Sequence, residues 1–387
     1  MTRLYLIRHA EAEGNLYRRI QGWYDSLITD RGRRQIAALE HRFESIPIDA
    51  VYSSDLFRTV TTAAAIYRPK GLPLQTRSDL REICLGVWED RPWGAVAYAD
   101  PERMRAFNRS LSSWSVEGGE TFRQVGGRMA AAVLDIAAQN PERTVAVFSH
   151  GMAIRALQGT LLGLPEEKWT TLGHGDNTCV TCIEVEGERI DVLWRNDNSH
   201  LPEEISTLAQ QSWWKAGSGV PEDTNLRYES LDMEKDGKLY YEARREAWLS
   251  IHHTIQNFNG DGFAREAMDQ WRVNPRSVTC AYLRSELVGI LQMDTSRYAA
   301  EGVGYIPFYY MTPKHRKNGM GVQLMGEAVS LYRQLGRDRL RLRCAPDNYI
   351  ARRFYQRYGF RKIGEAQGTR VPLDLLEKPI ALEGQAE

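Results

Sequence analysis

Short apolar runs that end abruptly in polar residues recur along the first half of the chain. Leu4 to Ile7 form one such run, which ends at Arg8 and His9, and residues 145–148 form another, which ends at Ser149 and His150. Brief runs that are apolar on both faces predict buried strands of a parallel sheet. Ligands bind at the carboxyl ends of such strands, where neighbouring ends meet. We therefore ask whether the two histidines share one site.

The wider pattern predicts two domains. From residue 3 to about 195, strand-like and helical runs alternate, which indicates a mostly parallel sheet with helices on its faces. Periodicity then fades, and Gly, Ser and Pro gather around 216–221, as in a linker. From Leu226 a new pattern begins, with a helical region at 240–258, a hairpin turning near 284–286, a strand at 304–312, a glycine loop, a helix and an alternating strand at 339–345. We expect domains at 1–205 and 226–387, joined by a linker at 206–225.

Composition narrows the class of protein without naming an activity. The 387 residues include 50 basic and 50 acidic ones, so no global field favours nucleic acid or an anionic membrane. No apolar stretch approaches the roughly 20 residues that span a bilayer, and the N-terminal pattern is a strand and not a signal peptide. We expect a cytoplasmic protein.

The five cysteines do not predict a disulfide framework, because they are scattered and odd in number. Cys179 and Cys182 have the CxxC spacing of redox and zinc sites, but they lie in a strand pattern, where residues three apart point to opposite faces. No second CxxC completes a zinc site, so we expect no metal here.

A third strand end adds an arginine to the two histidines. The strand at 50–52 stops at Ser53 and Ser54, and a helix begins near Asp55, which puts Arg58 in its first turns. With Arg8 and His150, Arg58 would surround the His9 imidazole with cationic groups. Guanidinium forks match phosphate oxygens, so the pattern predicts a pocket for a tetrahedral anion.

At these residues the N-terminal region, to about residue 200, resembles the histidine phosphatase (phosphoglycerate mutase-like) family. The matching segments are Arg8-His9-Ala10-Glu11 with Asn15, QGWYDSLITDRGRRQ at 21–35, Ser54-Asp55-Leu56-x-Arg58-Thr59, LREICLGVWED at 80–90, GGETFRQVGGR at 118–128 and Ser149-His150-Gly151. The order of these motifs is far more specific than any one of them. Ala10 departs from the Gly of many members. The resemblance implies a three-layer α/β/α fold and a phosphatase.

The resemblance also implies roles for individual residues. His9 would be the nucleophile that becomes a phosphohistidine, and Glu82 the proton donor to the leaving alkoxide. Charge on the phosphoryl oxygens would be stabilised by Arg8, Asn15, Arg58 and His150. Water would then hydrolyse the phosphohistidine, with no metal required.

The segment between Glu82 and Gly118 favours a phosphatase over a mutase. It holds about 35 residues (83–117), a compact lid like those of the family's phosphatases, whereas dedicated mutases carry longer insertions. Its aromatic residues are Trp88, Trp93, Tyr98, Phe107 and Trp114. They either pack the lid or contact an apolar or ring-bearing part of the substrate.

A second candidate site follows the strand that ends at Met311. The loop Arg316-Lys317-Asn318-Gly319-Met320-Gly321 precedes a helical pattern in Val322, Met325, Val329 and Tyr332. Glycines at a helix start let backbone N–H groups approach a phosphate, so the loop suits a pyrophosphate.

Residues 226 to about 380 resemble the GNAT N-acetyltransferase family, an α/β fold with a central mixed sheet. The R/Q-x-x-G-x-G/A loop matches Arg316, Gly319 and Gly321, and APDNYIARRFYQRYGF at 345–360 matches the family's Asn-to-Gly-Phe segment. The resemblance implies acetyl-CoA as acyl donor. The cofactor would be bound by three parts of the chain: the strand at Tyr310 and Met311, the glycine loop (Arg316, Asn318, Gly319, Met320 and Gly321) and Asn348. Tyr355 would protonate the departing thiolate. The general base stays open among Glu301, Asp294, His253 and water.

Together the two resemblances predict a bifunctional enzyme acting on small molecules. We expect one metabolite with a phosphate ester and an amine to be processed at both sites. Two alternatives stay open: the second domain senses acyl-CoA and regulates the phosphatase, or the protein acts on phosphoproteins and protein amines.

Overall fold

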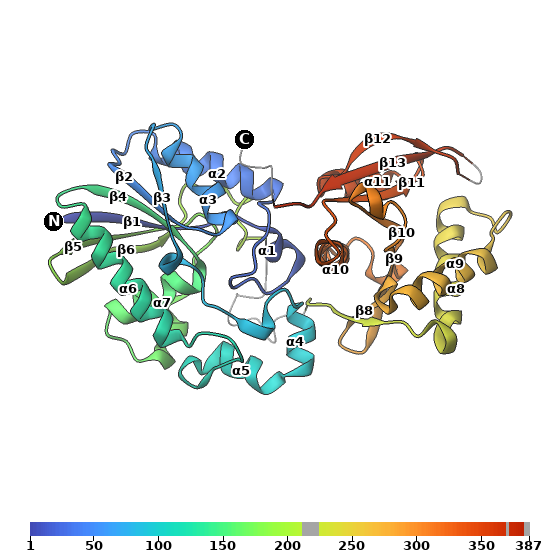
Figure 1. Ribbon diagram of the computed structural model, residues 1–387, viewed down its shortest axis with the longest axis horizontal. Coiled ribbons are helices and arrows are strands. Elements are labelled where there is room, and N and C mark those ends of the chain that lie inside the picture. Colours follow the sequence, from blue (N-terminus) through green and yellow to red (C-terminus); the bar gives the residue numbers. More distant parts are fainter. Residues whose placement is uncertain (211–223, 369–370, 383–387) are drawn as a thin grey trace. The chain divides into compact units, whose positions relative to one another are not determined.

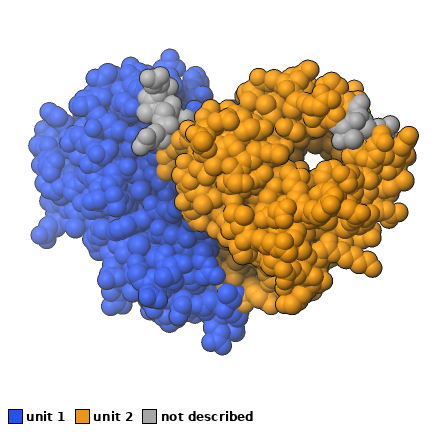
Figure 2. Space-filling view, turned by 45° about the vertical axis from the view of Figure 1, so that its right-hand side comes forward, with its two compact units in different colours: residues 1–91, 99–223, 386 blue, residues 92–98, 224–385, 387 orange. Residues whose placement is uncertain are grey.

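The computed structural model describes residues 1–210, 224–368 and 371–382 (Figure 1). The chain divides into two compact units, residues 1–91 with 99–223 and residues 92–98 with 224–385, which are coloured separately in Figure 2. Most of the expected linker, residues 211–223, lies outside the described part. The residues before it pack on the first unit, where the Thr207 hydroxyl accepts a hydrogen bond from Gln35 at 2.9 Å. Among the described residues, no helix is long and apolar enough to cross a membrane.

The first unit is a sheet between two layers of helices (Figure 1). Its strand order is β3-β2-β4-β1-β5-β6, with β3, β2, β4 and β1 parallel and β5 and β6 antiparallel. The strands are β1 (Thr2–Arg8), β2 (Ala50–Ser54), β3 (Leu74–Arg77), β4 (Thr144–Ser149), β5 (Val180–Glu186) and β6 (Arg189–Asp197). The helices are α1 (Glu13–Tyr17), α2 (Asp30–Phe43), α3 (Phe57–Tyr67), α5 (Pro101–Arg109), α6 (Phe122–Gln139) and α7 (Gly151–Leu161). The expected mostly parallel α/β/α fold is confirmed.

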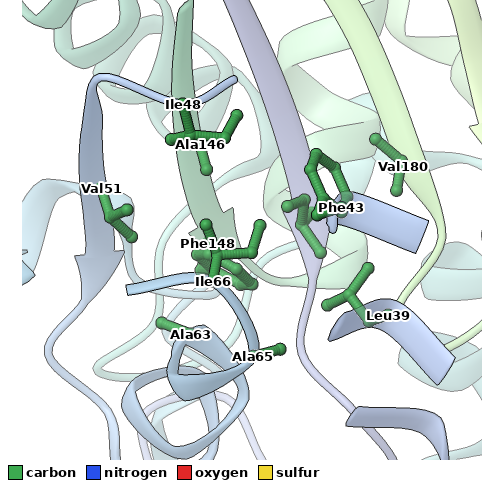
Figure 3. Packing of buried hydrophobic residues seen from close by; sticks show 11 residues of the cluster. Leu39, Phe43, Ile48, Val51, Ala63, Ala65, Ile66, Ala146, Phe148 and Val180 are labelled. Carbon is green, nitrogen blue, oxygen red and sulfur yellow. The ribbon is translucent and has the colours of Figure 1, made fainter. Parts of the chain in front are cut away.

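The apolar faces of α2 and α3 form one cluster of the core of this unit (Figure 3). Leu39 and Phe43 of α2 and Ile66 of α3 pack against Ile7 of β1 and Phe148 of β4, all at most 1% exposed. Burial of each such side chain contributes roughly 1.5–3 kcal/mol. The core therefore fixes β1 and β4 side by side just before the histidines that follow them.

The second unit is a mixed sheet of order β12-β13-β11-β10-β9-β8-β7, with one parallel pair, β10 and β11, among the described strands. Its strands are β7 (Arg227–Ser230), β8 (Val278–Leu283), β9 (Glu286–Asp294), β10 (Val303–Met311), β11 (Arg339–Cys344), β12 (Arg361–Ala366) and β13 (Leu373–Pro379). Its helices are α4 (Trp93–Ala99, of which 93–98 belong here), α8 (Met233–His252), α9 (Gly260–Val273), α10 (Gly321–Gln334) and α11 (Tyr349–Arg357). The expected hairpin turns at Arg284 and Ser285, and the mixed α/β fold is confirmed.

The sheet of this unit is covered on both faces. Helices α8 and α9 pack on one face through Tyr240, Ala243 and Ala267, which meet Ile290 and Phe308 of the sheet. On α10, every residue from Val322 to Tyr332 is buried, and a Cβ on Gly304 of β10 would lie 2.3 Å from the Tyr332 ring. Glycine at this position allows α10 to lie directly against the sheet.

Candidate functional site

The two histidines singled out in the sequence lie side by side in the first unit. Strands β1 and β4 pair in parallel with Arg8 opposite Ser149, so His9 and His150 leave the sheet together. Their ring centroids are 5.3 Å apart, with 56° between the ring planes. The structure thus brings the two strand ends to one place at the carboxyl edge of the sheet.

The His9 imidazole is buried and held in one orientation. It is 3% exposed, and its Nδ1 lies 2.7 Å from the carbonyl oxygen of Ala10. Burial, together with the positive charges of Arg58 and Arg8, lowers the pKa of His9 well below its ordinary value. The ring is therefore neutral near pH 7, as a nucleophilic nitrogen must be.

Arg58 is fully buried at the start of α3. Its guanidinium donates to the carbonyl oxygens of Gly22 at 2.6 Å and Tyr24 at 3.1 Å and pairs with Asp25 at 3.2 Å. These contacts use both terminal nitrogens and leave Nε without a hydrogen-bond partner. The segment 22–25 therefore fixes the position of the charge beside His9.

Two further buried nitrogens near His9 have no partner in the described structure, Nε of Arg8 and Nδ1 of His150. A Cβ on Gly151 would lie 3.1 Å from Arg8 Nε, so the arginine runs along the start of α7. His150 Nε2 lies 2.9 Å from the Ser54 hydroxyl, which fixes that ring. Burial, Arg58 and His9 lower the pKa of His150 well below its ordinary value. Arg8 Nε is a donor, and His150 Nδ1 is one in the tautomer whose Nε2 accepts from the Ser54 hydroxyl. Unpartnered buried donors are costly, and an oxyanion would satisfy them.

Glu82 lies at the N-terminus of α7. Its carboxylate accepts hydrogen bonds from the backbone N–H groups of Ala153 at 2.8 Å, Ile83 at 3.1 Å and Met152 at 3.2 Å. These bonds fix a nearly buried carboxyl group, 9% exposed, near the start of the helix that follows His150. Asn15 is placed differently: its Oδ1 accepts from the Ala12 N–H at 3.1 Å and caps α1, which leaves only its amide NH₂ for a ligand.

Arg155 is a site residue that the sequence analysis did not select. It lies on α7, and burial and the charge of Arg8 lower its pKa to about 10, while Glu82 opposes this change. It donates to Nδ1 of His174 at 2.5 Å, and its Nε has no partner. Arg155 is a single charged residue in the otherwise apolar segment that follows His150, and this pattern could have identified it from the sequence.

The aromatic residues of the 83–117 segment fall into two groups. Trp88, Phe107 and Trp114 pack on one another with Phe122, at centroid distances of 5.1 to 6.0 Å, and all are buried. Trp93 and Tyr98 belong to α4 and the second unit. This arrangement fits the interpretation that the aromatic residues pack the lid, because the buried rings contact one another.

The exposed aromatic ring next to the site residues is Trp23. It is 39% exposed, and its Nε1 donates to the carbonyl oxygen of Glu82 at 2.8 Å. The Arg81 guanidinium lies 4.9 Å from its ring centroid. Trp23 belongs to the 22–25 segment that holds Arg58, and it presents a partly exposed ring next to Glu82.

In the second unit, the sheet opens along β10. The pairing of β10 with β11 runs from Val303 to Ile306 and ends there, while its pairing with β9 shifts register between Tyr305 and Phe308 and continues to Met311. The edge of β10 from residue 307 onward therefore faces a gap in the sheet. Free backbone groups along such a gap suit an extended amide chain like the pantetheine of acetyl-CoA.

The glycine loop turns from this strand into α10. Lys317 and Gly319 have φ values of +66° and +83°, and a Cβ on Gly319 would meet nothing within 4 Å. Asn318 Oδ1 accepts from the Met320 N–H at 3.1 Å, and Gly321 is the first residue of α10. The first N–H groups of a helix have no partner within it and attract phosphate. The loop fits the pyrophosphate of the predicted cofactor.

The side chain of Arg316 is bonded to other residues and is not available to bind the pyrophosphate. It forms an ion pair with Glu246 of α8 and donates to Ser250 at 3.1 Å and to the Met311 carbonyl at 3.0 Å. Tyr310 lies next to it, with its ring centroid 5.7 Å from the guanidinium. Any contact of Arg316 with a phosphate would therefore use its backbone.

Tyr355 lies on α11, with its ring centroid 6.0 Å from that of Tyr309 of β10. It is 8% exposed, and burial raises the pKa of its phenol, so the hydroxyl keeps its proton. The Asn348 side chain accepts from the Ala351 N–H at 3.2 Å and caps α11. Tyr355 is thus positioned beside β10, whereas the Asn348 oxygen is used in the helix start.

The structure does not single out a general base for the second unit. Asp294 is buried and accepts from Gln270 at 3.0 Å and Ser296 at 2.8 Å, Glu301 pairs with Arg341 at 3.2 Å, and His253 ends α8 in a left-handed conformation. Within the described ranges, no group of three or more His, Cys, Asp and Glu residues could hold a metal ion. Cys179 and Cys182 are buried free thiols, and burial raises the pKa of Cys179 to about 12.

Sequence comparison identifies both units. Residues 4–198 match the model of the "Histidine phosphatase superfamily (branch 1)", and residues 240–360 match that of the "Acetyltransferase (GNAT) family". The first covers half of the chain. The GNAT match implies the use of acetyl-CoA, and the two matches make the protein an enzyme with a hydrolase and a transferase domain.

Known relatives match the first unit. Phosphoserine phosphatase 1 of Hydrogenobacter thermophilus is 32% identical over 52% of this chain and 96% of its own length. The probable phosphoglycerate mutase GpmB of Yersinia pestis is 37% identical over 43% of this chain and 77% of its own length. The solved structure of Bacillus stearothermophilus YhfR is 32% identical and covers 52% of this chain and 99% of its own, with a TM-score of 0.50. The chain belongs to the histidine phosphatase superfamily, branch 1, and carries a GNAT acetyltransferase domain after its phosphatase domain.

Proposed function

We propose that the first unit hydrolyses a phosphate monoester through a phosphohistidine on His9. The observation that carries this proposal is the set of buried nitrogens without partners, Nε of Arg8, Nε of Arg58 and Nδ1 of His150, next to a neutral imidazole. Together they fit the equatorial oxygens of a transferring phosphoryl group.

The proposed steps use the following contacts. Because Nδ1 of His9 faces a carbonyl oxygen, it carries the proton, and the Nε2 lone pair attacks phosphorus. The bond from phosphorus to the ester oxygen breaks, and Glu82 gives its proton to that oxygen. A water then attacks phosphorus and returns a proton to Glu82, the bond from Nε2 to phosphorus breaks, and inorganic phosphate leaves. The compact lid supports hydrolysis over transfer to a second substrate alcohol.

We propose that the second unit transfers an acetyl group from acetyl-CoA to an amine. The cofactor supplies an activated thioester. The loop 316–321 and the start of α10 would bind its pyrophosphate, with Asn318, Gly319, Met320 and Gly321 in contact. The edge of β10 at Tyr310 and Met311 would hold its pantetheine arm, and Asn348 would contact that arm through its amide. Tyr355 would give a proton to the sulfur that departs.

We further propose that one small metabolite carrying a phosphate ester and an amine is the substrate of both units. The relative named phosphoserine phosphatase supports this, because phosphoserine has both groups. A covalent link between the two activities raises the local concentration of a shared intermediate.

The test is a mass-spectrometric screen of the purified chain with acetyl-CoA and a panel of phosphorylated amines. We expect one compound to lose phosphate and gain acetyl, and the order of appearance to give the order of steps. If the changes fall on unrelated compounds, the shared substrate is wrong. If acetyl-CoA changes the phosphatase rate while no amine is acetylated, the second unit is a sensor. If phosphoproteins and protein amines react instead, the small-molecule assignment is wrong.

A further inference from the structure

Arg244 of α8 is a half-buried guanidinium in the second unit with unusual surroundings. Its Nε donates to the hydroxyl of Tyr240 at 2.7 Å, and its Nη2 donates to Oε1 of Gln292 at 2.7 Å and to the Pro307 carbonyl at 3.3 Å. The guanidinium carbon lies 4.1 Å from the ring centroid of Phe308 and 4.5 Å from that of Phe263. All of these partners are neutral.

A partly buried charge is stabilised by a counter-charge. Two other arginines of this unit have one, since Arg316 pairs with Glu246 and Arg276 pairs with Glu327 at 2.8 Å, whereas Arg337 donates to the carbonyl oxygens of Ala299 and Thr295. Over the described ranges, Arg244 makes no ion pair with a carboxylate, and its Nη1 makes no hydrogen bond. One edge of a positively charged fork is therefore available to a ligand.

The position of Arg244 connects this free edge to the predicted acetyl transfer. Its contact with Pro307 falls where the β9–β10 register shifts and just past Ile306, where β10 stops pairing with β11. Helix α8 lies on the face of the sheet that Phe308 and Tyr310 line, whereas Tyr309 at the position between them contacts Phe354 and Tyr355 of α11. Arg244 thus contacts the open part of β10 from the face opposite to Tyr355.

We propose that Arg244 binds an oxyanion of the amine that accepts the acetyl group, so that the acceptor is an amine carrying a carboxylate or a phosphate. The inference rests on the proposed acetyl transfer and names the acceptor class for that same site. Tyr240 and Gln292 hold the fork in place, and the rings of Phe263 and Phe308 cover its faces, which directs binding to the edge that Nη1 presents. A carboxylate or phosphate fits such an edge with charge-assisted hydrogen bonds.

The test measures acetyl transfer by the full chain carrying His9→Ala, so that phosphate esters stay intact. Four amines are compared. Serine carries a carboxylate, O-phosphoethanolamine a phosphate and O-phosphoserine both groups, whereas ethanolamine carries neither. We expect the oxyanion-bearing amines to have a KM lower by about tenfold or more than ethanolamine, in line with a charged hydrogen-bonded pair. Whichever single-anion amine is preferred identifies the group that Arg244 binds.

Arg244→Gln is expected to raise the KM of the preferred amine to that of ethanolamine. Arg244→Lys should restore part of the preference, and it also serves if the Gln variant does not fold. Arg245→Gln is the matched control, since Arg245 is half exposed and lies 3.6 Å from Glu242 on the same helix. Acetylation of ethanolamine as efficient as that of the other amines, or a preference that survives Arg244→Gln, overturns the inference while acetyl transfer stands. If none of the amines consumes acetyl-CoA, the proposed transfer fails and this inference with it.

Discussion

Nδ1 of His9 donates a hydrogen bond to the carbonyl oxygen of Ala10, 2.7 Å away. Because a carbonyl can only accept, this contact fixes the tautomer of the ring and leaves a lone pair on Nε2. The Ala-for-Gly departure at position 10 leaves this contact intact, since it uses the backbone of that residue. One backbone bond therefore determines which atom of the site can act as nucleophile.

Replacing His9 should abolish phosphate release and leave acetyl transfer unchanged. His9→Gln removes the nucleophilic nitrogen, and we expect a fall of at least about 10³-fold in kcat for p-nitrophenyl phosphate, as for loss of a covalent catalyst. His41→Gln is the control, because the side chain of His41 is 88% exposed on α2. A His9→Gln protein that turns over the ester as fast as the parent would show that the first unit only binds phosphate.

Replacing Glu82 should affect poor leaving groups more than good ones. Glu82→Gln keeps the size of the side chain but cannot donate a proton, so alkyl phosphates should slow by about 10²- to 10⁴-fold and p-nitrophenyl phosphate much less. The measurement is kcat for both esters in the parent, in Glu82→Gln and in Glu117→Gln, an exposed residue of the lid. An equal fall in kcat for both esters would show that Glu82 is not the general acid.

The lowered pKa values of His9 and His150 predict how the protein responds to acid. Both rings should stay neutral below 6.5, the ordinary value, so protonation of His9 should reduce kcat/KM only at a lower pH. The unfolded chain binds these protons below 6.5 and the folded one resists them, so stability is lost as pH falls through that value. Urea unfolding between pH 7.5 and 5 should show a smaller loss in His150→Gln than in the parent. A phosphatase rate that halves at pH 6.5 through His9 would contradict the assignment.

Sequence patterns alone brought together Arg8, His9, Arg58 and His150, because each of them ends or follows a strand or lies at a helix start, whereas Glu82 and Asn15 came only from the family resemblance. The apolar runs before His9 and His150 gave their strands, and parallel pairing alone brings such ends together. Long-range side-chain contacts were not predictable in this way. The ion pair that turns Arg316 toward Glu246 joins positions 70 apart in sequence. Arg244 likewise depends on Gln292 and Pro307, whose proximity only the folded sheet provides.

Removing the Tyr355 hydroxyl should slow acetyl transfer without weakening cofactor binding. Burial raises the pKa of this phenol, so it holds a proton for the departing sulfur at neutral pH. We expect Tyr355→Phe to lower kcat by about 10²- to 10⁴-fold, a typical contribution of general acid catalysis. Calorimetric titration with CoA should give an unchanged Kd. Tyr358→Phe on the same aromatic cluster is the control, and equal rates in the two variants would exclude Tyr355 as the acid.

Two glycine substitutions in the second unit should change stability in opposite directions. A methyl group on Gly304 would lie 2.3 Å from the ring of Tyr332, which is fully buried and bonded through its hydroxyl to the Tyr305 carbonyl. Because neither strand nor ring can move freely, Gly304→Ala should lower the free energy of unfolding by about 1–3 kcal/mol. Gly237 lies within α8, and the nearest atom to an added Cβ would be the Met233 methyl, 3.9 Å away. Because alanine favours a helix over glycine, Gly237→Ala should raise the free energy of unfolding by up to about 1 kcal/mol. Urea unfolding of both variants provides the measurement. A neutral Gly304→Ala would mean that α10 does not lie directly against β10.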